Sequence, residues 1–389
     1  MSIKKFLLFL TCILFSLHGI SQVPISEKQV DISSLSYYNS GQWKELLSYG
    51  KEQITQSVDF PLLRMRIGYA AFRLHNFSES LIHYEQVLQN DPTNQIAIYY
   101  AYLNNVYLGN ITTARFYAAQ LSIETKNAEK LKKFNIAELQ TEYSYKIPDA
   151  SFRANAQYSR IGLILHLGFK TTLEQSYANY SQTIAEPQFT SIINNNNIVI
   201  KQQEYYGKLK TALSNNVTAL GGVHYIYNRF NNLIYQNYVA FVGIQHTIPY
   251  TKFQANFFIG NIGDSSYKQV DLLITLLPKG NTNVYLISKI SYIDKLLYSQ
   301  IIGFKLLKNI WLEGNVTIGQ FTKVLENDGL YLYNDVDVKK LKAGSSLYFG
   351  LSKKLQFNLN YTFERKQRIF STKTIFNQNS INGGISWKF

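Results

Sequence analysis

Histidine is the residue type that most often carries acid–base or metal chemistry, and five lie beyond the N-terminal segment: His75, His83, His166, His224 and His246. No G-x-S-x-G nucleophile motif lies near them, and the sequence has no H-E-x-x-H metal motif or phosphate-binding glycine loop. The single cysteine lies inside an apolar N-terminal run, so no thiol is left for chemistry elsewhere. We therefore expect no enzyme activity, no cofactor and no metal site.

Two clusters of cations are a stronger candidate for binding. They fall at the start of one expected strand and at the end of the next, and comprise Lys339, Lys340, Lys342, Arg365, Lys366 and Arg368. Clustered cations gain most from multiply charged anions such as phosphate groups. A solvated loop base is the alternative interpretation. Which anion they meet depends on the elements that position them.

From about residue 136 onward, apolar and polar residues alternate as they do in β-strands. In residues 355–364, five apolar residues share one face, and Gln356, Asn358, Asn360, Thr362 and Glu364 share the other. Similar runs cover residues 161–169, 217–228, 253–259, 270–276 and 381–389. We expect about 12 to 14 strands, each near the roughly ten residues that a tilted membrane span requires.

Loop lengths favour a barrel over a soluble β-sandwich, which gives the same alternation. Long expected connections (185–198, 229–235, 322–341, 367–377) alternate with short ones (214–216, 278–281, 352–354). Outer-membrane barrels have this asymmetry, with long outer loops and short periplasmic turns. The prolines of this half, Pro148, Pro187, Pro249 and Pro278, all fall in expected connections. We predict an antiparallel barrel over residues 136–389, with the two cation clusters on its outer rim beside lipopolysaccharide phosphates.

The N-terminus has the pattern of a secretory signal. Lys4 and Lys5 precede an apolar run from Phe6 to Leu17, and small residues follow, so we expect cleavage after Ser21. The formal net charge of +14 then becomes 14 − 2 = +12 for the exported chain. A basic exported chain suits lipid phosphates or acidic solutes, and no nucleic-acid motif is present. The 30 tyrosines suit membrane interfaces, where a ring needs one apolar and one wet end.

Residues 26–134 have helical spacing and a 34-residue period. Trp43, Phe77 and Ile111 lie at equal intervals, with Gly41, His75 and Gly109 two residues earlier in each unit. This period resembles the tetratricopeptide repeat, in which each helix pair buries its apolar face against the next. The matching positions are Gly41, Trp43, Leu46, Gly68, Phe77, Tyr84, Pro92, Gly109 and Ala114. An ordinary helical bundle is the alternative.

The final strand resembles the insertion signal of outer-membrane barrels. Phe389 is the terminal aromatic residue, and Trp387, Ile385 and Ile381 alternate before it. The resemblance implies insertion by the barrel-assembly machinery. A leader, a periplasmic α-solenoid over residues 26–134 and a C-terminal barrel make an α + β multidomain chain. That order resembles the YaiO-like outer-membrane proteins and the tetratricopeptide porins that export exopolysaccharide.

Three functions follow from these expectations. The first is a channel or export pore for polysaccharide or small solutes, since barrels of 16–18 strands leave an aqueous lumen and smaller ones can be plugged. The second is a non-channel scaffold, in which the barrel anchors repeats that bind a periplasmic protein or glycan. The third is a lipid-modifying barrel enzyme, although the sequence has no nucleophile motif near its histidines.

Overall fold

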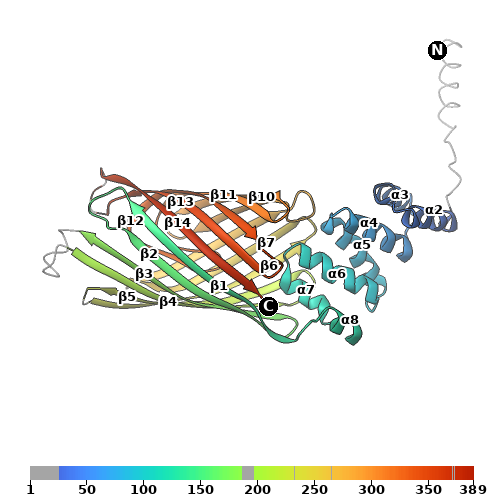
Figure 1. Cartoon of the computed structure of the whole chain (residues 1–389), viewed down its shortest axis with the longest axis horizontal. Helices are drawn as coiled ribbons and strands as arrows, with labels where there is room; N and C mark the ends of the chain where they lie inside the picture. The colour runs from blue at the N-terminus through green and yellow to red at the C-terminus, as the bar shows by residue number, and fades with distance from the viewer. Residues whose placement is uncertain (1–25, 186–196, 232, 264, 370, 372) are drawn as a thin grey trace, which may run out of the picture. The chain divides into compact units, whose positions relative to one another are not determined.

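The computed structural model describes residues 26–185, 197–231, 233–263, 265–369, 371 and 373–389, so the expected signal segment lies outside the described residues. The described chain begins with seven helices and continues with 14 strands (Figure 1). The helices are α2 Glu27–Asn39, α3 Trp43–Thr55, α4 Pro61–Arg73, α5 Phe77–Asn90, α6 Gln95–Tyr107, α7 Ile111–Ala118 and α8 Ile123–Ala128. None of these helices is both long and apolar enough to cross a membrane.

The 34-residue period of the sequence reappears in the backbone. Helices α3, α5 and α7 begin at Trp43, Phe77 and Ile111. The turns before them hold Gly41, His75 and Gly109 with φ of 70°, 59° and 71°, the left-handed region in which a helix commonly ends. Of the other repeat positions, Leu46, Tyr84 and Ala114 are buried, Gly68 lies within α4, and Pro92 follows α5.

Contacts divide the chain at Leu74 into two compact units. In the first, α2, α3 and α4 share an apolar core of Val30, Leu46, Leu63, Ile67 and Ala70. The second unit runs from His75 to Phe389 and holds α5–α8 together with all the strands. This division falls inside the region expected as one helical domain, residues 26–134. Polar bonds between α5–α7 and the strands, described below, join these helices to the barrel within the second unit.

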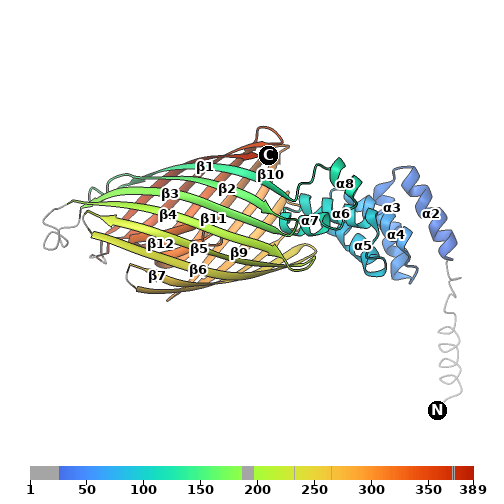
Figure 2. The same cartoon turned by 90° about the horizontal axis from the view of Figure 1, so that it is seen from below.

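The strands close into one antiparallel barrel (Figure 2). Each pairs with its neighbours in sequence, and β14 pairs with β1, Tyr143 opposite Gly383. Their bounds are β1 Phe134–Pro148, β2 Ala156–Leu167, β3 Thr171–Ala185, β4 Asn197–Ala212, β5 Val217–Phe230, β6 Leu233–Ile248, β7 Thr251–Ile262, β8 Ser265–Leu276, β9 Val284–Tyr292, β10 Leu296–Leu307, β11 Ile310–Glu326, β12 Tyr331–Gly350, β13 Leu355–Gln367 and β14 Ile375–Lys388. The expected antiparallel barrel is confirmed, with 14 strands.

The barrel has its apolar face outside and its polar face inside. On β8, Leu272 and Ile274 are 55% and 42% exposed, whereas the alternate residues Gln269 and Asp271 are buried. The strand predicted most clearly, β13, behaves in the same way: Leu359 and Tyr361 lie outside, and its amides line an internal cavity. The residues of the expected insertion signal, Ile381, Ile385, Trp387 and Phe389, are all exposed. A protein surrounded by water would bury these rows of apolar side chains on the outer faces of its strands.

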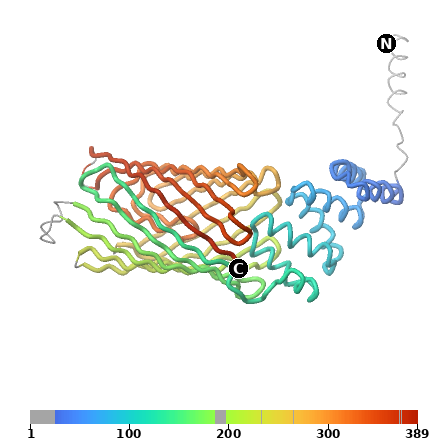
Figure 3. The backbone as a smooth tube through the Cα atoms, viewed as in Figure 1, coloured from blue at the N-terminus to red at the C-terminus, as the bar shows by residue number. Residues whose placement is uncertain are grey.

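The two ends of the barrel differ only partly in their connections. Connections at 168–170, 213–216, 249–250, 277–283, 308–309 and 351–354 share one end, which includes every short turn predicted from sequence. The opposite end has the longest connection, after β3, but also connections of two or three residues after β5, β7 and β9. Phe389 lies at that same end (Figure 3). At the other end, the long loop expected over 229–235 is a tight turn, because β5 continues to Phe230 and β6 begins at Leu233. The loop expected over 322–341 is a β-hairpin, and most of residues 185–198 lies outside the described residues.

Helices α5–α7 bond to four consecutive short turns of the barrel. The Ser78 amide donates to the Gly280 carbonyl (3.0 Å), and the Tyr250 hydroxyl donates to Glu79 (2.9 Å). Asn215 donates to Glu85, and Arg115 donates to the Gly168 carbonyl (2.8 Å). At Gly280, φ is 63° and a Cβ would lie 1.9 Å from the Asn76 side-chain oxygen, so the close approach requires glycine. The second unit is therefore held together by specific polar contacts at this end.

Candidate functional site: a hairpin inside the barrel

Residues 322–338, at the ends of β11 and β12, form a hairpin that we call the luminal hairpin. The ladder between the two strands is regular as far as Ile318 opposite Leu341 and then shifts register twice. It resumes from Lys323 opposite Asn334 to Glu326 opposite Tyr331. Gly319, with φ of 133°, lies at the first shift, where a Cβ would be 2.5 Å from Leu297 Cδ2. Such bulges bend a strand pair, and here the hairpin leaves the wall.

The hairpin lies inside the barrel because its side chains meet inward-facing residues of five wall strands. Leu325 and Leu330 join one buried apolar cluster with residues of β4–β8, namely Tyr206, Leu220, Val239, Phe241, Phe258, Ile262 and Tyr267. In a water-filled pore, these inward-facing apolar side chains would be exposed to water, which is unfavourable. Burial of this surface is the largest nonpolar contribution that holds the hairpin in place.

The tip of the hairpin makes the deepest polar contacts. The Asp328 carboxylate lies 3.1 Å from Lys208 Nζ and accepts hydrogen bonds from Gln254 Nε2 (2.6 Å) and Asn256 Nδ2 (3.3 Å). The Tyr206 hydroxyl donates to the Asp328 carbonyl at 2.9 Å. We call the end of the barrel that holds Phe389 and the connections bonded to α5–α7 the turn end. Lys208 lies close to the turn end of β4, and Gln254 lies close to the turn end of β7. The tip therefore reaches most of the way through the barrel.

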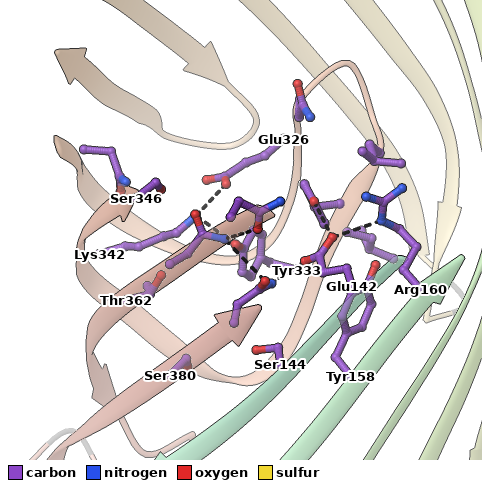
Figure 4. A pocket seen from close by; sticks show the side chains of 18 of the residues that line it. Glu142, Ser144, Tyr158, Arg160, Glu326, Tyr333, Lys342, Ser346, Thr362 and Ser380 are labelled. Carbon is purple, nitrogen blue, oxygen red and sulfur yellow. Dashed lines mark hydrogen bonds and ion pairs between the residues drawn. The ribbon is translucent and has the colours of Figure 1, made fainter. Parts of the chain in front are cut away.

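The second strand of the hairpin faces β1, β2 and the base of β12 (Figure 4). Tyr331 donates to Glu142, which also pairs with Arg160 at 3.0 Å. Lys342 lies 2.5 Å from Glu326 and 2.8 Å from the Tyr333 hydroxyl. Charged hydrogen bonds in a site with little water are stronger than exposed ones, so each fixes the hairpin's position.

The base of the hairpin is held by two groups of buried ions. Lys339 is fully buried and lies 2.5 Å from Asp335 and 2.9 Å from Glu364, with Lys366 completing the group at 3.0 Å from Asp335. In the second group, Arg153 in the β1–β2 connection makes a bidentate pair with Asp337, at 2.7 and 2.8 Å. Each of the hairpin's four carboxylates thus has a lysine or arginine partner.

A cavity of about 730 Å³ remains between the hairpin and the wall, mainly along β1, β2 and β11–β14. Amides and hydroxyls such as Gln140, Ser144, Asn358, Thr362 and Asn382 line it, together with carboxylates and tyrosines. Ser386 and Lys388 place its lower part at the turn end of the barrel. A space of this size accommodates a small solute, and its lining suits a polar one.

The structure separates the six cations predicted at the outer rim. Lys339, Lys342 and Lys366 are buried in the ion pairs just described, whereas Arg365 is exposed. The cause is a β-bulge between Lys339 and Leu341, which inserts a residue into β12 and turns both Lys339 and Lys342 inward. The expected lipopolysaccharide contact is corrected for the three buried lysines. It stays a prediction for Arg365, the half-buried Lys340, and Arg368, which lies 4.4 Å from the Phe152 ring.

Three of the five histidines, His75, His83 and His224, have structural roles. Both ring nitrogens of His224 are engaged, one with the Gly329 carbonyl (2.6 Å) and the other with Glu204 (3.0 Å). His75 holds the turn before α5, and His83 is buried near Glu79. Among the described residues, no group of three His, Cys, Asp or Glu side chains could hold a metal ion.

The pKa of Glu85, in α5, makes the stability of the second unit dependent on pH. Burial raises the pKa of Glu85, and hydrogen bonds from Tyr117 and Asn215 offset part of this rise. The folded chain therefore binds this proton more strongly than the unfolded chain, so the stability that it gains from protonated Glu85 is complete below pH 4.5 and is lost as the pH rises through the raised pKa.

Glu85→Gln is expected to abolish this pH dependence. Hydrogen exchange of residues 77–118, corrected for its intrinsic pH dependence, measures the effect between pH 4.5 and pH 7. Equal pH dependence in the native chain and in Glu85→Gln would show that another group is responsible.

The fold and its interior define a class: a closed antiparallel barrel whose lumen holds a hairpin from its own wall. No family model and no curated relative matches the sequence. Solved structures with a similar fold include the monoaromatic hydrocarbon channel CymD, with 6% sequence identity and a TM-score of 0.47 over 66% of this chain and 89% of that one. A Pseudomonas aeruginosa FadL homologue has 9% identity and a TM-score of 0.47 over 75% and 94%. These similarities are too distant to assign a family.

Proposed function

We propose that this chain is an outer-membrane barrel that acts as a gated channel for polar solutes, with the luminal hairpin as its gate. The observation that carries the proposal is the hairpin itself, which fills one side of a lumen whose other side keeps a polar cavity. Fourteen strands enclose more space than side chains alone can fill, since an 8-stranded barrel is already filled by them. The luminal hairpin fills part of the remaining space and is joined covalently to the wall only at its two ends, so it can also leave the lumen.

The outward apolar rows support a membrane location, together with the predicted leader and terminal strand. Leu272→Arg, on the outer face near the middle of β8, is expected to cost about 2–4 kcal/mol of folding free energy. Leu273→Arg is the matched control, because Leu273 lines the cavity and its substitution places the charge in the lumen. Urea unfolding in phospholipid vesicles measures both variants. Equal costs would contradict a lipid-facing position for Leu272.

Phe389 lies at the end that carries α5–α8, and the longest connection between strands, after β3, lies at the other end, which supports a periplasmic position for α5–α8. The 34-residue period of helix starts supports the proposal that α3–α7 belong to a tetratricopeptide array. An array in the periplasm could deliver a glycan or a protein partner to the turn end of the barrel. For a polymeric cargo such as a polysaccharide, the hairpin must leave the lumen entirely, whereas a small solute needs only partial displacement.

Planar-bilayer recording tests the channel. The native chain is expected to be almost silent, and a variant in which a four-residue Gly/Ser turn replaces residues 322–338 is expected to conduct steadily. The regular ladder between β11 and β12 ends outside the deleted segment, so the barrel can close without it. Heat-modified mobility in gels and circular dichroism check that the variant is folded. A folded variant that remains silent would overturn the channel.

A silent folded variant would instead favour the scaffold, in which the barrel only anchors the helices. The specific observation behind this second candidate is that the hairpin is fully partnered, as a permanent plug would be. Crosslinking in cells, with and without residues 26–134, tests it. The scaffold requires partners that disappear on truncation, and an unchanged set of partners would exclude it.

A further inference from the structure

The wall around the hairpin tip is built like a receptor for a carboxylate. Three side chains from β4 and β7 surround Asp328: Lys208 contributes a cation, and Gln254 and Asn256 contribute amide donors. Both carboxylate oxygens are bound, Oδ2 by the lysine and Oδ1 by the two amides. We call Lys208, Gln254 and Asn256 the carboxylate cradle. Its donors belong to the rigid wall, and its occupant belongs to the segment proposed to move.

Further cations continue from the carboxylate cradle toward the turn end of the barrel. Lys210 is the next inward residue of β4, and Lys252 is the inward residue that precedes Gln254 on β7. Neither has a carboxylate within ion-pair distance among the described residues, and Lys252 Nζ donates to the Leu108 carbonyl. Lys208 also pairs with Glu174 at 2.9 Å, so once Asp328 has left, Lys208, Lys210 and Lys252 together face this one carboxylate.

The hairpin is the acidic partner of this basic surface. Residues 322–338 hold four carboxylates, Glu326, Asp328, Asp335 and Asp337, and one lysine, so their net charge is 1 − 4 = −3. When the hairpin leaves, these carboxylates leave with it, and the lysines and Arg153 of the wall and loops lose partners. An open lumen would therefore be more cationic than the closed one.

We infer that Asp328 occupies a binding site for the carboxylate of an anionic solute, which competes with it and releases the hairpin. This inference rests on the proposed gated channel and adds its cargo class: solutes that carry a carboxylate, such as organic acids or acidic sugars. Competition couples binding to opening, because a ligand shifts a two-state equilibrium only by binding one state better. The solute binds only the state in which Asp328 has left.

The first test measures binding without relying on conduction. Calorimetry with succinate and with glucuronate uses the folded variant that lacks residues 322–338, and glucose is the uncharged probe. Both acids are expected to bind and glucose is not. Lys208→Gln in the same background is expected to weaken binding about tenfold or more, since a charged hydrogen bond of roughly 1.5–3 kcal/mol is lost. Lys340→Gln is the matched control, outside the lumen and expected to have no effect.

The second test uses the full chain in planar bilayers. Succinate is expected to raise the opening frequency while glucose leaves it unchanged, and Asp328→Asn is expected to open more often without any solute. In a salt gradient, the reversal potential of the hairpin-lacking variant is expected to show anion selectivity, reduced by Lys208→Gln. Steady current without anion selectivity, together with no calorimetric binding of either acid, would overturn the carboxylate cradle and leave the channel standing. No current from a folded variant would overturn the channel itself.

Discussion

Replacement of Lys339 by methionine is expected to cost about 3–5 kcal/mol of folding free energy, the usual penalty when one partner of a buried ion pair is removed. The ammonium group of Lys339 is fully buried between Asp335 and Glu364. Without it, two carboxylates share only Lys366, whose Nζ is 3.3 Å from Glu364. Methionine keeps most of the side-chain volume, so the change isolates the charge.

Lys340→Met is the matched control for this prediction. It makes the same chemical change one residue further along β12, at a half-buried position without a carboxylate partner in the described structure. Its expected cost is within about 0.5 kcal/mol, the usual range for surface substitutions. Urea unfolding of both variants in the same vesicles decides the matter. A small and equal effect would show that Lys339 does not lie among the carboxylates of the hairpin base.

Arg153→Met is expected to have a cost of similar size and to loosen the gate. Arg153 and Asp337 are both almost completely buried, and the bidentate pair joins the hairpin base to the β1–β2 connection. Loss of the guanidinium leaves Asp337 buried, with the Ile369 amide donating to its carboxylate at 3.2 Å. About 3–5 kcal/mol is again expected. Because the lost contact fixes the hairpin and does not join wall strands to each other, brief openings should also appear in bilayer recordings.

A double variant separates pairing from packing at this contact. Arg153→Met combined with Asp337→Leu removes both charges and is expected to recover most of the lost stability, since apolar replacement of a whole buried pair is often neutral. Unfolding measurements on the two single variants and the double variant give the coupling energy between the residues. Additive losses would show that Arg153 and Asp337 do not interact.

The strands of the wall could be predicted because each presents a lipid face and a wet face. Leu359 and Tyr361 lie outside as expected, while Asn358 and Asn360 line the cavity. The helix starts at Trp43, Phe77 and Ile111 were visible as a period, because each repeats the same turn geometry. Local pattern sufficed in both cases, since the surroundings of each residue repeat at fixed spacing.

The luminal hairpin was predicted only as a loop, although its sequence alternates. Tyr331, Tyr333, Asp335 and Asp337 occur at every second position, which is a strand signal. The intervening residues are too mixed for a lipid face, so the run does not resemble a wall strand. The two-residue period could have indicated a hairpin, but its burial depends on wall residues more than 70 positions away, such as Gln254 and Lys208.

The cation clusters show the same limit of sequence reasoning. Their expected position at the outer rim assumed that a strand begins near Lys342, whereas β12 begins at Tyr331 and a bulge follows Lys339. Acidic partners in the same region, Asp335 and Glu364, are a sequence signal that buried pairs were possible. Register shifts of this kind arise from tertiary packing of the hairpin and leave no local mark in the residue pattern.

Thiol accessibility tests most directly whether the hairpin occupies the lumen. The only cysteine of the sequence lies in the N-terminal segment expected to be cleaved, so single engineered cysteines can be labelled selectively. Leu330→Cys replaces a buried residue of the apolar cluster and keeps every charge, and Lys373→Cys marks an exposed position between β13 and β14. In vesicles, a bulky water-soluble maleimide should label Leu330→Cys at least about tenfold more slowly than Lys373→Cys, because labelling requires the hairpin to open. Equal labelling rates would contradict the hairpin gate.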